Sequence, residues 1–113
     1  MPMLTLDVRT LDDTLQEFAG ALKGGEPSRP RISFETPELL WQVLTAKRWE
    51  ILKTMTGAGA LAIREIARRV GRDVKAVHGD VHALLDAGIL EKTDAGIIFP
   101  YDSIHVDFML KVA

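Results

Sequence analysis

The chain has 113 residues, 47% of them hydrophobic and 27% charged, with a net charge of −2. This composition fits one domain with a single core and argues against global disorder. The absence of cysteine excludes disulfides, thiol catalysis and cysteine-ligated metals; with no apolar run near the ~18 residues of a membrane span and no signal-peptide pattern, we expect a cytoplasmic protein without a membrane partner.

The first third of the chain predicts a strand, a helix and a second strand. Residues 4–8 alternate apolar and polar side chains, which is typical of a strand with one buried face. Residues 11–22 carry apolar side chains at helical spacing, after a threonine cap and before two glycines. Residues 31–35 alternate again. We expect 1–35 to be a strand–helix–strand segment for dimerisation or for a partner protein.

The middle of the chain, residues 36–100, predicts helices followed by a β-hairpin. Threonine and aspartate caps mark helix starts, and glycines mark helix ends. The expected helices cover 36–44, 45–57, 63–70 and 73–87, and the expected hairpin strands cover 89–93 and 96–99. In the last of these helices the side chains expected to face inward are Val74, Val77, Val81, Leu84 and Leu85.

The C-terminal segment, residues 101–113, predicts one more strand. Its apolar residues alternate without interruption, and those expected to contribute to dimerisation are Ile104, Val106, Phe108 and Leu110. Such a strand needs a cover, either from strands of the same chain or from a second copy across a two-fold axis. We favour a dimerisation layer built from residues 3–9, 31–35 and 103–112.

The helices over 63–70 and 73–87 are separated by the turn Gly71-Arg72-Asp73, and the hairpin follows them. A turn this short makes the second helix cross the first steeply, so that its N-terminal half can enter the major groove of DNA. With the valines inward, the residues expected to face the bases are Lys75, Ala76, His78, Gly79 and His82. Two of these are small, as a close approach to base edges requires.

Positive charge is concentrated in the same region. Between Lys47 and Lys75 there are eight basic and three acidic residues, a local net charge of +5. The side chains expected to bind DNA phosphates are Arg64, Arg68, Arg69, Arg72 and Lys92. A solvated basic helix surface is the alternative interpretation.

The run LAIREIARRVGRDVKAVHGDVHALLDAGILEKTDAGIIFPY, from Leu61 to Tyr101, resembles winged helix-turn-helix regulators of the MarR/ArsR-like superfamily. The matching positions are Ile63, Glu65, Ile66, Ala67, Gly71, Val77, Val81, Leu84, Ala87, Gly88, Ile89 and Leu90. The resemblance implies an α+β winged helix-turn-helix fold, with an additional N-terminal strand–helix segment and a C-terminal strand. It also implies a homodimer that binds double-stranded DNA as a transcriptional regulator, in the manner of a repressor or autorepressor. The hairpin departs from the pattern, because Lys92 is its only cation and Asp94 stands beside it.

The flanking runs FETPELLWQVLTAKRWEIL and FPYDSIHVDF are similar to a subgroup of predicted DNA-binding regulators, some of which are thought to be antitoxins. The alternative function is therefore an antitoxin or adaptor that uses the fold mainly to bind a protein. In that case the acidic first third of the chain would hold a basic toxin.

Three further patterns in the sequence have plainer explanations. His78 and His82 have the spacing of two helical metal ligands, but glycine stands at position 79 where a zinc protease needs glutamate. His105 and Asp107 form a carboxylate–histidine pair without a nucleophile or an oxyanion donor. Trp41 and Trp49 can wall a ligand pocket, although their helical spacing favours a place in the core. We expect no enzyme activity, no cofactor and no metal.

Overall fold

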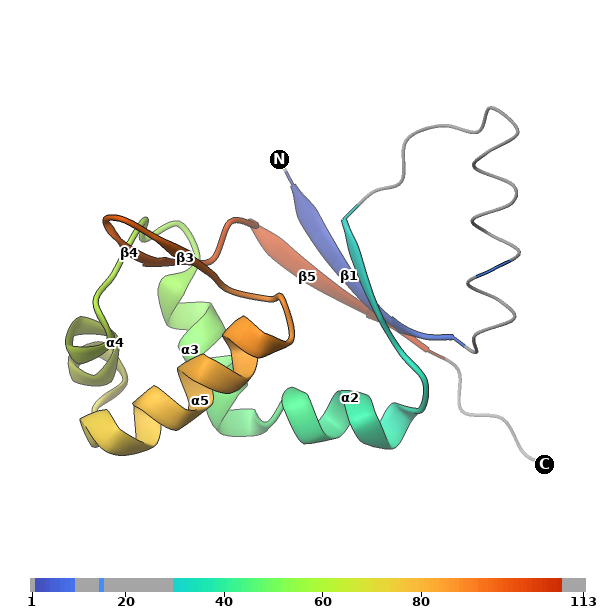
Figure 1. Ribbon diagram of the computed structural model, residues 1–113, viewed down its shortest axis with the longest axis horizontal. Coiled ribbons are helices and arrows are strands. Elements are labelled where there is room, and N and C mark those ends of the chain that lie inside the picture. The colour runs from blue at the N-terminus through green and yellow to red at the C-terminus, as the bar shows by residue number, and fades with distance from the viewer. Residues whose placement is uncertain (1, 10–14, 16–29, 109–113) are drawn as a thin grey trace.

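The computed structural model describes residues 2–9, 15 and 30–108 as an α+β arrangement of helices and two small sheets (Figure 1). The strands are β1 (Met3–Val8), β2 (Arg31–Phe34), β3 (Glu91–Thr93), β4 (Gly96–Ile98) and β5 (Ser103–Asp107). The helices are α2 (Pro37–Val43), α3 (Ala46–Met55), α4 (Ile63–Val70) and α5 (Val74–Asp86). In the described part of the chain, no helix is both long and apolar enough to cross a membrane.

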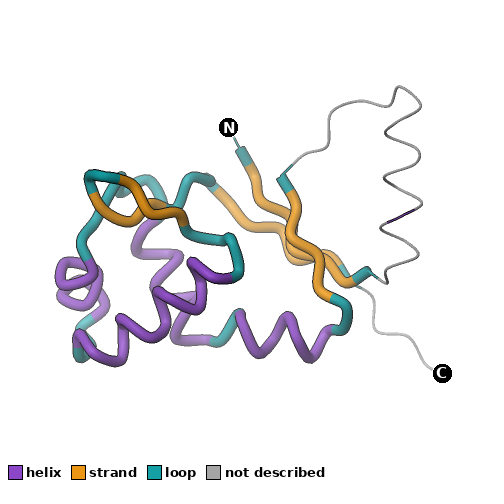
Figure 2. The backbone as a smooth tube through the Cα atoms, in the orientation of Figure 1, coloured by secondary structure: helices purple, strands orange, loops and turns teal. Residues whose placement is uncertain are grey.

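The N-terminal and C-terminal strands lie in one parallel sheet within the same chain. The strand order is β2-β1-β5, with Leu6 opposite Ile32 on one side and opposite Val106 on the other. Leu4 and Leu6 are buried on the face turned toward the helices. Of the two pairings expected for the C-terminal strand, the structure thus contains the one within a single chain. Figure 2 shows this sheet beside the helical part of the molecule.

Three of the described helices, α2, α3 and α5, begin where side-chain caps predict. The hydroxyl of Thr36 accepts a hydrogen bond from the backbone N–H of Leu39 at 3.2 Å, and the hydroxyl of Thr45 accepts one from that of Arg48 at 3.3 Å. These bonds satisfy N–H groups that a helix leaves without an internal partner. The helices and hairpin strands predicted for residues 36–100 are all present, with ends within two residues of the prediction.

The core is one cluster of buried residues that extends from β1 through the helices α2, α3, α4 and α5. Val77, Val81 and Leu84 on the inner face of α5 are fully buried, as are Ile51 of α3 and Ile66 of α4. α5 contacts both α3 and α4, so these three helices form one packed unit. The period of the buried residues follows the helical repeat that predicted them.

The hairpin β3–β4 is hydrogen-bonded to the segment before α4. The backbone N–H of Leu61 donates to the carbonyl of Ile97 at 2.9 Å, and the N–H of Ile97 donates back to Leu61 at 2.8 Å. Gly96 has a φ of +138°, and a Cβ built there would stand 2.9 Å from the carbonyl oxygen of Leu61. The close approach of these two backbones therefore requires glycine.

Some predictions differ from the structure. Val74 was expected to face inward but is 43% exposed, at the first position of α5. Trp41 and Trp49 were expected in the core but are 50% and 38% exposed. The helix predicted over 11–22 lies outside the described residues, apart from an exposed Leu15. The end of the predicted C-terminal strand, 109–113, also lies outside them, and β5 ends at Asp107.

We predict that Gly96→Ala lowers the free energy of unfolding by roughly 1–3 kcal/mol, because it places a methyl group against backbone atoms at a φ that other residues rarely adopt. Gly79→Ala is the matched control. It lies inside α5 with nothing within 4 Å of the added Cβ, so we expect it to stabilise the helix by roughly 0.5–1 kcal/mol. Urea unfolding followed by circular dichroism measures both, and equal stabilities of the two variants would contradict the close approach at Leu61.

Candidate nucleic-acid interface

The turn between α4 and α5 is built by glycine and aspartate. Gly71 ends α4 in the left-handed region with a φ of +69°, and Asp73 caps α5. The Asp73 carboxylate accepts hydrogen bonds from the backbone N–H groups of Lys75 at 3.0 Å and Ala76 at 3.3 Å. The chain therefore changes direction within three residues, and α5 starts as a helix from its first turn.

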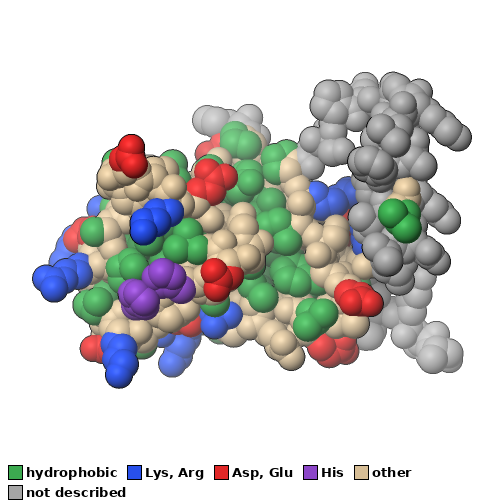
Figure 3. Space-filling model, viewed as in Figure 1, with side chains coloured by type: hydrophobic (Ala, Val, Ile, Leu, Met, Phe, Trp, Pro, Cys, Tyr) green, Lys and Arg blue, Asp and Glu red, His purple; other side chains and the backbone are tan. Residues whose placement is uncertain are grey.

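The outer face of α5 is open to solvent. Lys75, Ala76, His78, Gly79 and His82, the residues predicted to face DNA bases, are all exposed. The rings of His78 and His82 lie side by side, with centroids 4.1 Å apart and an interplanar angle of 37°. In Figure 3, histidine side chains form a patch at the end of the molecule that holds α4, α5 and the hairpin, with Lys and Arg side chains on several sides of the patch and an acidic side chain beside it.

The arginines of α4 are paired with a glutamate of the same helix. Both carboxylate oxygens of Glu65 accept hydrogen bonds from Arg68 at 2.6 Å, and one of them also accepts a bond from Arg69 at 2.9 Å. The hydrogen bonds from Arg68, and then those from Arg69, lower the pKa of Glu65 to about 2. The Arg68 side chain nevertheless stays 71% exposed. Because ion pairs at the surface contribute little free energy, a DNA phosphate can compete with Glu65 for these arginines.

Arg72, also predicted to contact phosphate, is turned into the protein instead. Its Nη2 atom lies 2.8 Å from one carboxylate oxygen of Asp80, and Nε of Arg48 lies 3.0 Å from the other. Arg48 further donates from Nη1 to the carbonyls of Gln42 and Val43, both at 3.0 Å. The Arg72 side chain is 22% exposed and already neutralised, so its geometry favours a structural role over a phosphate contact.

The Asp80 cluster, which we define as Arg48, Arg72 and Asp80, connects three helices. Partial burial by itself would raise the pKa of the Asp80 carboxyl, but hydrogen bonds from Arg72 and Arg48 outweigh it and hold the pKa below its ordinary value. The cluster joins the middle of α5 to the first turn of α3 and the last turn of α2. Through it the orientation of α5 depends on the junction between α2 and α3.

The remaining cations of this region are fewer than the sequence predicts. Lys53 forms an ion pair with Glu50 at 3.6 Å, and four arginines of the region are also ion-paired, as described above. Within the described residues, Arg64, Lys75 and Lys92 are the predicted DNA contacts that have no ion pair. All three are exposed. The charge available for phosphates is thus about half of what a count of basic residues indicates.

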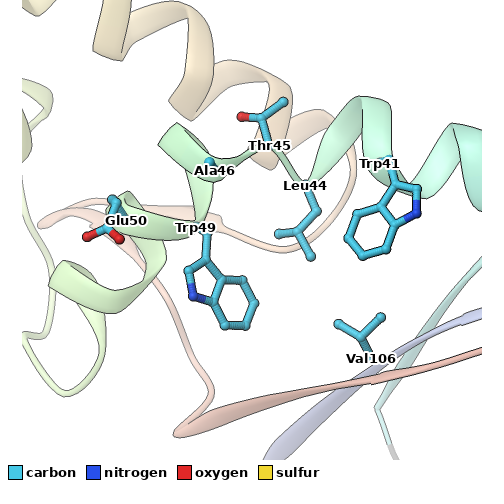
Figure 4. Close-up of a pocket in the computed structure, with 7 residues that line it drawn as sticks. All are labelled: Trp41, Leu44, Thr45, Ala46, Trp49, Glu50 and Val106. Atoms are coloured by element: carbon cyan, nitrogen blue, oxygen red, sulfur yellow. The ribbon is translucent and has the colours of Figure 1, made fainter.

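The residues predicted for dimerisation lie beside an apolar groove. A hollow of about 500 Å³ is lined by Trp41 from α2, Leu44 just after α2, Trp49 from α3 and Val106 from β5, and the two indole rings point toward the same space (Figure 4). Ile104 and Val106 are half-buried. The ring of Phe108 meets that of Trp41 edge-on, with centroids 5.5 Å apart. Leu110 lies outside the described residues.

The other polar patterns in the sequence lead to no assembled site. Among the described residues, no group of three or more histidine, aspartate and glutamate side chains is placed to hold a metal ion. His105 and Asp107 are both exposed on β5. On the neighbouring strand Asp7 is buried, where it accepts hydrogen bonds from Ser33 at 2.6 Å and Arg9 at 3.0 Å.

The chain belongs to the HVO_A0114 family, whose model matches residues 43–106, more than half of its length. The match begins at the end of α2 and ends within β5, so it covers α3, α4, α5, the hairpin and most of the C-terminal strand. Neither a curated protein nor a solved structure matches the chain.

Sequence reasoning did not find the Asp80 cluster. The signal was present, because Asp80 lies next to Val81 on the side of α5 that turns toward α3, where a charged residue needs a partner. The sequence did not reveal its partners, since Arg48 is 32 positions away and the chain holds eight arginines that could pair with Asp80.

We predict that Asp80→Asn lowers the free energy of unfolding at neutral pH by roughly 1–3 kcal/mol, because two half-buried guanidinium groups lose a charged acceptor. The pKa of Asp80 is lower in the folded than in the unfolded chain, so its contribution is present above about pH 4 and is lost as the pH falls through the folded value. The stability difference between wild type and variant should therefore shrink in acid.

Urea unfolding at several pH values measures this difference. Asp86→Asn is the matched control, since Asp86 is exposed on the same helix, and it should leave the stability nearly unchanged. A difference that persists undiminished at pH 2–3 would contradict the assignment.

Proposed function

We propose that this protein is a sequence-specific, double-stranded DNA-binding regulator of the winged helix-turn-helix class, which acts as a repressor or autorepressor. In this proposal α4 and α5 are the helix-turn-helix, α5 reads the major groove and the hairpin β3–β4 is the wing. The observation that carries the proposal is the outer face of α5, where small and cationic side chains stand exposed on a helix held firmly from behind.

The shape of this face supports major-groove binding. An α-helix fits the major groove when its outward side chains allow a close approach to the base edges. Ala76 and Gly79 leave such room, and nothing lies within 4 Å of a Cβ added at Gly79. Lys75 can donate to guanine or to a phosphate, and His78 and His82 supply hydrogen-bonding groups one turn further along.

The hairpin supports a limited wing contact. Lys92 is exposed on β3 and has Asp94 at the nearby turn. One cation suits a contact to the DNA backbone and does not provide the cluster of charges that deep insertion into the minor groove would use. Most of the binding free energy should then come from α4 and α5.

We predict that the protein binds duplex DNA of random sequence at low salt, with an affinity that falls as salt rises. If Arg64, Lys75 and Lys92 each contact one phosphate, the log–log salt slope per protomer should be about −3, and release of Arg68 and Arg69 from Glu65 would bring it to about −5. Fluorescence anisotropy with labelled duplex at several salt concentrations measures the slope. A protein that serves only as an antitoxin or adaptor would show neither the binding nor the salt dependence, and that result would contradict the proposal.

A set of variants separates phosphate contacts from base contacts. Replacing both Arg68 and Arg69 by alanine should weaken binding to all sequences about equally, because phosphates carry no sequence information. Glu65→Gln should strengthen binding and steepen the salt slope, because it removes the competing carboxylate. Lys75→Ala and His78→Ala should instead change the preferred sequence.

Selection of bound duplexes from a random pool, followed by sequencing, measures the preferred site of each variant. Asp86→Asn, on the same helix but beyond the proposed reading residues, is the control and should keep the wild-type site. If Lys75→Ala and His78→Ala also kept that site, α5 would not be the reading helix.

A further inference from the structure

One edge of the three-stranded sheet lacks the features that normally protect edge strands. The strand order leaves β2 and β5 at the edges. β2 follows Pro30 and begins with Arg31, and proline and charge both discourage pairing with another chain. β5 has the sequence Ser-Ile-His-Val-Asp, with no proline, lysine or arginine. Within the described residues it pairs with β1 alone.

The seam between β5 and the helices is also incompletely filled. Besides the groove of about 500 Å³, a second hollow of about 160 Å³ lies along the same strand, between Ile104 and two residues, Leu52 of α3 and Thr56 just after α3. Trp49 lines both hollows. An exposed apolar strip next to an open strand edge is typical of a surface that binds protein.

We propose that a second copy of this chain docks at the free edge of β5, with the two β5 strands antiparallel about a two-fold axis at His105. The hollow of about 500 Å³ beside Trp41 and Trp49, which we call the tryptophan groove, would be covered by the dimer in each copy. The choice of a second copy rests on the proposed function, because helix-turn-helix proteins read two half-sites related by two-fold symmetry. The pairing would join two three-stranded sheets into one continuous sheet.

The sequence of β5 is self-complementary in this register. His105 is the middle residue of the strand, so centring on it pairs all five residues and gives the greatest overlap. Ile104 then lies opposite Val106 of the other copy, on the groove side. Ser103 lies opposite Asp107, so a hydroxyl rather than a second carboxylate faces the charge. Apolar and polar residues therefore each meet suitable partners.

The patch is small for a stable dimer. The two hollows are lined by twelve different residues, and His105, Asp107 and Phe108 bring the patch to fifteen. A standard interface uses about 20–30 residues on each side, so we expect a dissociation constant in the micromolar range. None of the lining residues belongs to α5, which leaves both reading faces free to bind DNA.

The experiment is sedimentation velocity of the full chain without DNA, over a range of micromolar concentrations. The wild type should shift from 12.5 kDa toward twice that mass as concentration rises. His105→Lys, at an exposed position, should remain monomeric because it places two lysines opposite each other across the axis. Trp41→Ala should weaken the dimer by roughly tenfold or more, because Trp41 forms one wall of the covered groove.

Glu91→Gln is the control, since it changes the charge by the same amount at an exposed position of β3 and should dimerise like the wild type. Circular dichroism checks that each variant is folded. A wild type that stays monomeric, or a His105→Lys variant that dimerises normally, would overturn the interface. If the interface is overturned but the protein still binds DNA in a salt-dependent way, the proposed function stands. If the protein dimerises but does not bind DNA, the proposed function is overturned and the interface stands.

Discussion

The whole arrangement depends on the way α5 is held from one side. Val77, Val81 and Leu84 are fully buried against α3 and α4. Burial of one such aliphatic side chain contributes about 1.5–3 kcal/mol, which exceeds what an exposed ion pair provides. Apolar packing therefore positions the helix, while the Asp80 cluster sets its orientation relative to α3. The opposite face of α5 is left free, and its small and polar side chains make it the most distinctive surface of the molecule.

Ion pairs within the protein determine how many of its basic residues remain available to a ligand. A net charge of −2 is unusual for a protein that binds DNA. The sequence between Lys47 and Lys75 carries an excess of positive charge, yet Glu65 and Asp80 together bind four of its arginines. The remaining cations are few and scattered, which favours weak non-specific attraction. Discrimination between sequences would then rest on the fit of α5 in the groove more than on charge.

Local rules predicted much of the fold. Caps at Thr36, Thr45 and Asp73, the glycine at position 71 and the helical spacing of buried residues all act within a few positions, and the predicted elements for 36–100 match the structure. Long-range features were not predictable in the same way. The parallel order β2-β1-β5 and the partners of Arg48 and Arg72 depend on contacts between distant residues. The exposure of Trp41 and Trp49 had no local signal, because helical spacing does not reveal whether an opposing surface exists.

Hydrogen bonds of Arg48 connect the groove beside Trp41 and Trp49 to α5. Arg48 bonds both to the end of α2, beside the tryptophan groove, and to Asp80 in the middle of α5. A partner that occupies the groove and a DNA duplex that receives α5 would thus act on neighbouring ends of one hydrogen-bond network. The network therefore offers a physical route between the proposed dimer interface and the proposed DNA-binding face.

The central claim is that the outer face of α5 meets DNA, and a nuclear magnetic resonance titration of the labelled protein with a short duplex at low salt tests it most directly. The account predicts that the largest changes in backbone amide signals fall on Lys75, Ala76, His78, Gly79 and His82, with smaller changes at Arg64 and Lys92. Changes confined to the three-stranded sheet, with the signals of α5 unaltered, would contradict it.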